Sequence, residues 1–239
     1  MLRSLSVALF LLLVGCSHVI RPDLQENRVN TQVTSEVQKQ TVRFLALGDS
    51  YTIGQSVPEE ERWPEQLAVI LNEQGFDTQV TIIARTGWTT DDLLAGMSAQ
   101  LVQEEYDLVS LLIGVNDQYR GGAPEDYRPR FRELLEQAIA LAGNDPQNVI
   151  VLSIPDWEVT PFANQMSRST RMFSVDAFNK VNSQEAQAYG TRYVDITPIS
   201  RRVIEEKELL ALDGLHPSGV MYALWVQEML PVVLEIVRN

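Results

Sequence analysis

Five short apolar segments, each followed by a segment of helical character, constrain the fold of this chain more than any other feature. The apolar segments are rich in Val, Ile and Leu and occupy residues 42–47, 79–85, 107–114, 148–155 and 192–198. Helical segments follow at 63–75, 89–102, 124–143, 174–190 and from about residue 217 to the C-terminus. Apolar strands that alternate with helices are typical of a parallel sheet covered on both faces. We therefore predict one α/β domain, a three-layer α/β/α arrangement around a five-stranded parallel sheet.

The N-terminus has the features of a bacterial export signal. Arg3 precedes an apolar stretch over residues 5–14 that is shorter than the roughly 20 residues needed to span a bilayer. The stretch ends in the sequence LVGC, which resembles a lipobox. This resemblance implies cleavage before Cys16 and attachment of lipid to its sulfur. The alternative is an inert free cysteine near an apolar N-terminus.

The predicted organisation is a lipoprotein signal peptide over residues 1–15, a lipidated Cys16 with a flexible tether over residues 16–40, and one folded domain over residues 41–239. The tether is polar and lacks sustained periodicity. Ser17, rather than Asp, follows the cysteine. We expect a lipid-anchored protein of the bacterial cell envelope, on the outer membrane facing the periplasm if the cell is Gram-negative.

Charge and composition argue against several classes of protein. The net charge is −13 and there is no dense run of Lys or Arg, so a nucleic-acid partner is not expected. The single cysteine allows no intrachain disulfide, and no Cys/His cluster indicates a zinc site. No GxGxxG follows the first apolar segment and no GxxxxGK[ST] occurs. The sequence therefore argues against a zinc site and against these nucleotide-binding sites.

Polar residues follow the predicted strands where open α/β sheets assemble their sites, at the carboxyl ends. Ser50 follows the first strand, Gly87 the second and Asn116 the third. Asp213 and His216 lie between the fifth strand and the last helix. We expect all five residues at one edge of the sheet.

These residue types complement one another chemically. The Ser50 hydroxyl becomes nucleophilic when a base removes its proton. Of the two histidines, His18 and His216, only His216 lies within the predicted domain. Asp213 precedes it by three residues and is close enough to orient its ring. The Asn116 side chain and the amides of Gly87 and Ser50 are candidates to stabilise an oxyanion.

The chain resembles the SGNH hydrolases, the GDSL-type esterases and lipases. Four blocks of that family appear in order: LGDSYTIG, ARTGWTT, GVND and DGLHPS. The resemblance covers about residues 41–239 and implies a flavodoxin-like fold. It also implies serine ester hydrolysis through an acyl-enzyme, with no metal and no organic cofactor. Ser50, Asp213 and His216 would be the catalytic residues, with Ser50, Gly87 and Asn116 as the oxyanion hole. Each also fits a structural role, as a helix cap, a turn residue or the start of a helix.

The substrate is less well indicated. The connection over residues 155–173 is long and carries Trp157, Phe162, Met166, Met172 and Phe173. Part of it is expected either to wall a substrate pocket or to be pinned to the domain.

Further candidates lie near the third motif and along the same rim. Tyr119 joins Trp157 and Phe162 as a candidate substrate contact. Arg120 could meet a charged substrate group or a nearby carboxylate. Trp63 and Trp88 are either stacking platforms or core residues.

Three functions remain open. The first is an envelope-anchored esterase acting on short or medium acyl esters. The second is a carbohydrate O-acetylesterase of envelope or extracellular polysaccharide. The third is a lipoprotein that binds acylated ligands without turnover, although a binder needs no histidine placed against a serine. The expected partners are a small-molecule or carbohydrate ester and the membrane.

Overall fold

The computed structural model describes residues 39–100, 105–165 and 172–239, and the predicted signal peptide and lipidated Cys16 lie outside these ranges. Within them the chain forms a five-stranded sheet in the order β2–β1–β3–β4–β5, with every neighbouring pair parallel. The strands are β1 (Gln40–Gly48), β2 (Phe76–Ala84), β3 (Leu108–Leu112), β4 (Val149–Leu152) and β5 (Arg192–Val194). This is the flavodoxin-like order, so the predicted α/β class is confirmed.

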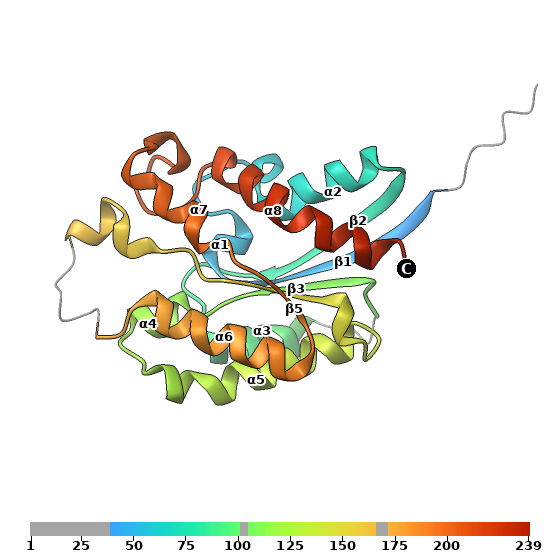
Figure 1. Cartoon of the computed structure of the whole chain (residues 1–239), viewed down its shortest axis with the longest axis horizontal. Helices are drawn as coiled ribbons and strands as arrows, with labels where there is room; N and C mark the ends of the chain where they lie inside the picture. The colour runs from blue at the N-terminus through green and yellow to red at the C-terminus, as the bar shows by residue number, and fades with distance from the viewer. Residues whose placement is uncertain (1–38, 101–104, 166–171) are drawn as a thin grey trace, which may run out of the picture. The chain divides into compact units, whose positions relative to one another are not determined.

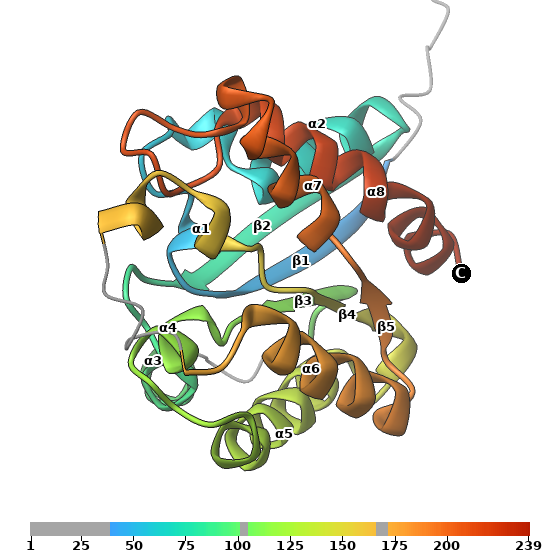
Figure 2. The same cartoon turned by 60° about the vertical axis from the view of Figure 1, so that its left-hand side comes forward.

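Helices cover both faces of the sheet (Figures 1 and 2). On one face α2 (Trp63–Glu73) packs against α8 (Gly219–Val237), and on the other α5 (Pro124–Leu141) lies between α3 (Thr90–Gln100) and α6 (Val175–Tyr189). Shorter helices occupy the loops: α1 (Ser50–Ile53), α4 (Val115–Tyr119), α7 (Thr197–Arg201), η1 (Glu59–Glu61), η2 (Pro146–Asn148), η3 (Trp157–Val159), η4 (Phe162–Gln165), η6 (Arg202–Ile204) and η7 (Lys207–Leu209).

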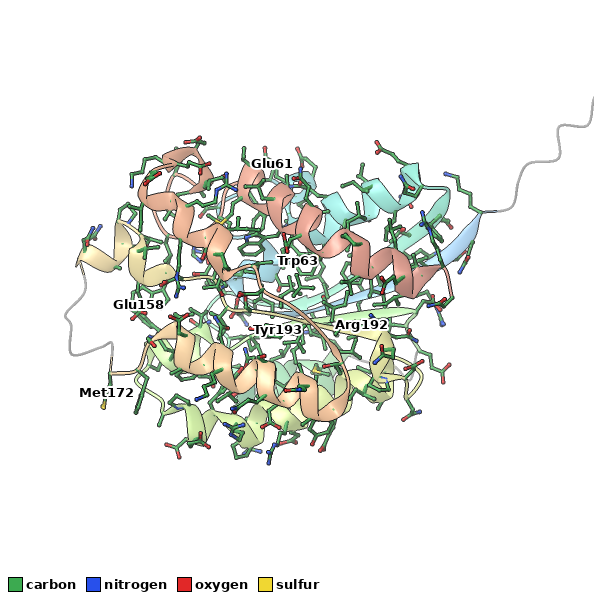
Figure 3. The ribbon with its side chains drawn as sticks, viewed as in Figure 1. Glu61, Trp63, Glu158, Met172, Arg192 and Tyr193 are labelled. Atoms are coloured by element: carbon green, nitrogen blue, oxygen red, sulfur yellow. The ribbon has the colours of Figure 1, made fainter. Side chains whose placement is uncertain are left out.

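Burial explains why these segments become strands. The central strands β3 and β4 are buried at every position, which matches their continuous apolar sequence. The edge strand β2 alternates between more and less exposed positions along much of its length. Trp63 is fully buried between the α2–α8 layer and the sheet, with its ring 5.9 Å from that of Phe44 (Figure 3). Trp63 is therefore a core residue.

The structure differs from the sequence prediction at the fifth strand. The predicted strand over residues 192–198 ends at Val194, and α7 begins at Thr197 with Pro198 in its first turn. The hydroxyl of Ser153 accepts hydrogen bonds from the backbone N–H groups of Ile196 and Thr197, at 2.8 and 3.0 Å. The Ser153 side chain, just after the end of the neighbouring strand β4, thus accepts from the two N–H groups that a longer β5 would have paired with a strand.

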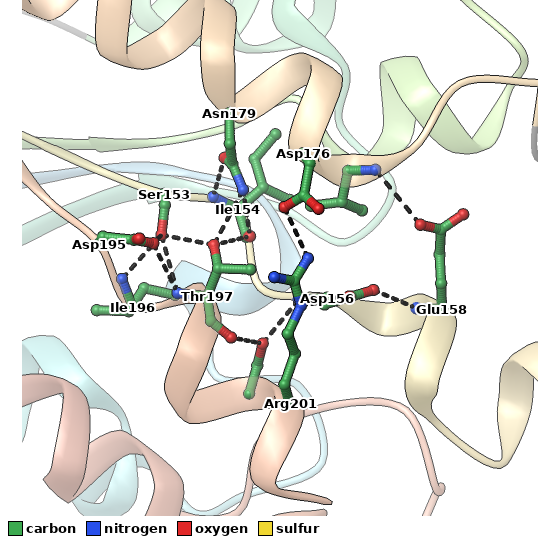
Figure 4. A network of polar contacts seen from close by, with 12 residues as sticks. Ser153, Ile154, Asp156, Glu158, Asp176, Asn179, Asp195, Ile196, Thr197 and Arg201 are labelled. Carbon is green, nitrogen blue, oxygen red and sulfur yellow. Dashed lines mark hydrogen bonds and ion pairs between the residues drawn. The ribbon is translucent and has the colours of Figure 1, made fainter. Parts of the chain in front are cut away.

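A buried polar network ties α6 and α7 to the end of β4 (Figure 4). Asn179 accepts from the Ile154 N–H at 2.7 Å and donates to the Ile154 carbonyl at 3.0 Å and to Thr197 Oγ1 at 2.9 Å. Nearby, Arg201 bridges Asp156 and Asp176, at 2.8 and 2.6 Å. The network fixes the start of the connection that leads from β4 towards the sheet's carboxyl edge.

We predict that Asn179→Ala lowers the free energy of unfolding by about 2 kcal/mol or more, because it leaves the buried Ile154 N–H without its acceptor and removes one donor each from the Ile154 carbonyl and Thr197 Oγ1. Urea denaturation measures the change. Lys180→Ala, at the exposed neighbouring position, is the control and should change stability by less than about 0.5 kcal/mol. Equal stability of the two variants would contradict the role given to the network.

Candidate active site

The turn after β1 holds Ser50 at the carboxyl edge of the sheet. Asp49 caps α1 by accepting the Tyr51 N–H at 3.0 Å, which fixes the first turn of the helix. A Cβ on Gly48 would lie only 2.5 Å from the Leu112 carbonyl oxygen of β3. The strand therefore ends in Gly-Asp-Ser because β1 and β3 approach closely there and the next residue must begin a helix.

His216 joins Ser50 to Asp213. The His216 Nε2 atom lies 3.0 Å from Ser50 Oγ, and its Nδ1 atom lies 2.6 Å from Asp213 Oδ2. The carboxylate accepts hydrogen bonds only, so we assign the imidazole proton to Nδ1, which leaves Nε2 to accept from the serine hydroxyl. Ser50 and His216 are each 5% exposed, and the Tyr51 ring packs 5.5 Å from the imidazole. Sequence motifs 166 residues apart thus form one hydrogen-bonded chain.

The Asp213 carboxylate is saturated with hydrogen-bond donors. Its Oδ1 atom accepts the N–H groups of Leu215 and His216, each at 2.9 Å, and its Oδ2 atom accepts the Ser56 hydroxyl at 2.6 Å as well as His216 Nδ1. Burial acts to raise the pKa of Asp213, but these bonds outweigh it and lower the pKa from 3.8 to about 2. The group is therefore ionised at neutral pH.

Gly87 and Asn116 line the same cavity as Ser50. Gly87 has a φ of +81° in a turn closed by the Trp88 N–H and the Arg85 carbonyl, at 3.2 Å. The Asn116 side chain donates one hydrogen to the Trp88 carbonyl at 2.9 Å, and an amide nitrogen carries two, so one remains for a ligand. These contacts place both candidate oxyanion donors beside the serine.

Arg120 meets a nearby carboxylate, which is one of the two partners that the sequence suggested, and it also bonds to the backbone of the Gly87 turn. Its Nη2 atom donates to the Gly87 carbonyl at 2.7 Å, and its Nη1 atom lies 3.8 Å from Asp92. Arg120 therefore braces the turn that carries Gly87. It is not among the residues that line the cavity.

The cavity beside Ser50 has a volume of about 220 Å³ and an aromatic wall. Tyr119, Trp157 and Phe162 all line it, and their rings pack on one another at centroid distances of 5.3 to 6.5 Å. Asp, Glu, Lys and Arg are absent from the described residues that line it. The three candidate substrate contacts thus come together around an uncharged pocket.

Among the described residues of the connection over residues 155–173, Trp157 and Phe162 line this cavity. Met166 lies outside the described residues, and Met172 is 71% exposed and points away from the domain (Figure 3). Phe173 packs against the core. Trp88 likewise packs against the core, with its ring over Gly96, and does not line the cavity.

Sequence reasoning missed three polar residues that support the site. Gln118 accepts from Trp157 Nε1 at 2.8 Å and donates to the Phe173 carbonyl at 2.7 Å, which anchors the aromatic wall to α4. Gln55 accepts from the Thr86 hydroxyl at 2.7 Å, and the Ser56 hydroxyl donates to Asp213. Each lies within six residues of a recognised motif, and that proximity was the available signal.

Among the residues that the structure describes, no group of three or more His, Cys, Asp or Glu side chains could hold an ion.

Known proteins resemble the chain in sequence and fold. The sequence pattern of the GDSL-like lipase/acylhydrolase family matches residues 46–224. An arylesterase from Vibrio mimicus is 30% identical over 206 residues, which cover 86% of this chain and 93% of the relative. Esterase TesA from Pseudomonas aeruginosa is 25% identical over 186 residues, which cover 78% and 84% of the two chains. The acetylxylan esterase Axe2 from Geobacillus stearothermophilus shares the fold, with a TM-score of 0.63 and 19% identity over 82% of this chain and 95% of that one.

The matched range contains every residue of the hydrogen-bonded chain and both candidate oxyanion donors. Both sequence relatives are esterases, and the alignments cover most of the length of each. The chain therefore belongs to the GDSL-like lipase/acylhydrolase family and is a serine ester hydrolase.

Proposed function

We propose that the protein hydrolyses uncharged carboxylic esters through an acyl-enzyme on Ser50. The observation that carries the proposal is the 3.0 Å contact between Ser50 Oγ and His216 Nε2, with Asp213 on the far side of the ring. The serine oxygen attacks the ester carbonyl while its proton passes to Nε2. The imidazolium then gives that proton to the departing alcohol. Water repeats the sequence on the acyl-serine, which releases the acid and returns the proton to Ser50.

The oxyanion formed in each half-reaction needs donors that are already in place. The amides of Ser50 and Gly87 and the second hydrogen of the Asn116 amide are the donors we assign to it. The turn at Gly87 is held by Asn116 and Arg120, so these donors need little reorganisation as charge develops. The Asp213 carboxylate stabilises the imidazolium that forms at the same time.

A fluorophosphonate probe tests this mechanism, because it phosphonylates activated serines. We predict labelling of the wild-type protein at Ser50, located by peptide mass spectrometry. Ser50→Ala should abolish labelling and lower kcat on p-nitrophenyl acetate by about 10⁴ or more, while the melting temperature stays nearly unchanged. An unlabelled but folded wild-type protein would remove Ser50 from the mechanism and favour ligand binding without turnover.

The cavity favours small acyl groups. Its volume of about 220 Å³ lies below the roughly 300–1,000 Å³ of pockets that enclose drug-sized ligands. Its wall of Tyr119, Trp157 and Phe162 suits apolar or aromatic groups rather than charged ones. The arylesterase relative supports the same choice. We therefore propose short-chain esters, including aryl esters, as substrates.

Removing one ring of the wall should lengthen the acyl group accepted. Phe162→Ala is predicted to raise the ratio of kcat/KM for p-nitrophenyl octanoate over acetate roughly tenfold, because it opens apolar space at the cavity. Met172→Ala, in the same connection but exposed, is the matched control and should leave the ratio unchanged. An unaltered ratio in Phe162→Ala would place the acyl group elsewhere.

Acetylated carbohydrates are the second candidate class. A cavity of this size accepts an acetyl group, and aromatic rings at its wall offer faces on which a sugar can stack. The substrate series that compares acetate with octanoate therefore includes an acetylated xylose. Turnover of that sugar at a higher kcat/KM than p-nitrophenyl acetate would favour the carbohydrate O-acetylesterase.

We further propose that the enzyme is anchored in the bacterial envelope through lipid on Cys16, at the outer membrane facing the periplasm if the cell is Gram-negative. The support is the sequence LVGC after a charged start and an apolar centre, followed by a polar tether. The structure does not describe these residues.

Cys16→Ser should release the protein from the membrane fraction without changing its kcat, because the domain is untouched. Fractionation of cells that express the full chain, with esterase activity measured in each fraction, checks this. If the variant stays in the membrane fraction, the anchor is not on Cys16.

A further inference from the structure

Ser56 has a backbone conformation that serine seldom adopts. It lies in the turn after α1, six residues beyond the nucleophile, with a φ of +70°. Among the described residues other than glycine, only Ser56 and Asn144 have a positive φ, and asparagine is a common occupant of that region whereas serine is not. The end of α1 does not itself require serine here, because Gly54 already provides its left-handed C-cap.

This conformation aims the Ser56 hydroxyl at the Asp213 carboxylate. The hydroxyl donates to Asp213 Oδ2 at 2.6 Å, and the same oxygen lies 2.6 Å from His216 Nδ1. Asp213 sits at the tip of a loop that a backbone bond from Ala211 to His216 closes, 157 residues from Ser56 in sequence. The contact therefore connects the turn of the nucleophile to the loop of the acid and base.

We propose that Ser56 is a positioning residue of the esterase reaction, which holds Asp213 Oδ2 in line with His216 Nδ1. The inference rests on the proposed function, in which that pair stabilises the imidazolium. Two backbone N–H groups hold the Oδ1 atom of the Asp213 carboxylate, and the Ser56 hydroxyl holds its Oδ2 atom. Together these bonds resist rotation of the carboxylate. Strained backbone is typically retained where it serves such a site.

No phenol is among the donors to Asp213 that the structure describes: its hydrogen bonds come from the Ser56 hydroxyl, the Leu215 N–H and His216. Ser56 is exposed and does not line the cavity, so its removal should affect the reaction without affecting substrate binding.

The test compares Ser56→Gly with Ser56→Ala. Both lose the hydroxyl, but glycine relieves the left-handed conformation and alanine keeps it strained. We expect both to lower kcat on p-nitrophenyl acetate about tenfold with KM unchanged, the effect of losing one hydrogen bond to a charged group. The melting temperature should be higher in Ser56→Gly than in Ser56→Ala. Asn144→Gly, which relieves the same conformation far from the site in sequence, should keep the wild-type kcat.

Full kcat in Ser56→Gly would overturn the proposal, and so would a loss confined to Ser56→Ala, since that would assign the effect to the backbone. A rise in KM at constant kcat would also overturn it. Fluorophosphonate labelling of the wild-type protein separates this failure from a failure of the proposed function. If the wild-type protein is labelled at Ser50 and Ser56→Gly is fully active, only the role of Ser56 is lost.

Discussion

The hydrogen bond between His216 and Ser50 depends on almost everything else in the fold. Ser50 is placed by the end of β1. This is the point of the sheet, between β1 and β3, where the order of the strands reverses. His216 is placed by the start of α8, and α8 is held by its packing on α2 and on the sheet. The polar turn that ends β1 thus lies where a buried strand, a short helix and an imidazole from the far end of the chain meet.

A buried carboxyl lies directly beside this contact. Burial, reinforced by the charge of Asp117, raises the pKa of Asp49 from 3.8 to about 7, although the Tyr51 N–H acts in the opposite direction. The unfolded chain ionises this group near 3.8, so unfolding releases a proton that the folded state holds. The contribution of Asp49 therefore becomes less favourable to folding as pH rises from 3.8 to about 7. The cap on the nucleophile's helix is a group that is partly uncharged near neutral pH.

The sheet and its larger helices could be predicted from the sequence, because burial requires a recognisable apolar pattern in long segments. The sequence did not reveal where β5 ends, since that boundary depends on the Ser153 hydroxyl of another strand's end. The helices α1 and α4 span four and five residues, which is too short for a helical periodicity to appear in the sequence.

The same reasoning explains what was found and missed at the site. Ser50, Gly87 and Asn116 stand in motifs at predicted strand ends, where the topology brings them together, and Asp213 and His216 stand in a fourth motif just before the last helix. Ser56 and Gln118 act through contacts with residues far along the chain, and a positive φ at serine leaves no mark in the sequence. Such contacts become visible only in three dimensions.

Two rings of the aromatic wall, Trp157 and Phe162, lie outside the sheet, in the connection between β4 and α6. Trp157 is joined to α4 by the Gln118 side chain, and the Phe162 N–H donates to the Gly214 carbonyl of the loop that carries Asp213, at 3.2 Å. Exchanges of residues within that one connection alter the shape presented to an acyl group while the strand ends stay where they are. Selectivity in this enzyme can therefore be changed through one connection, while the reacting groups keep the supports that β1 and α8 give them.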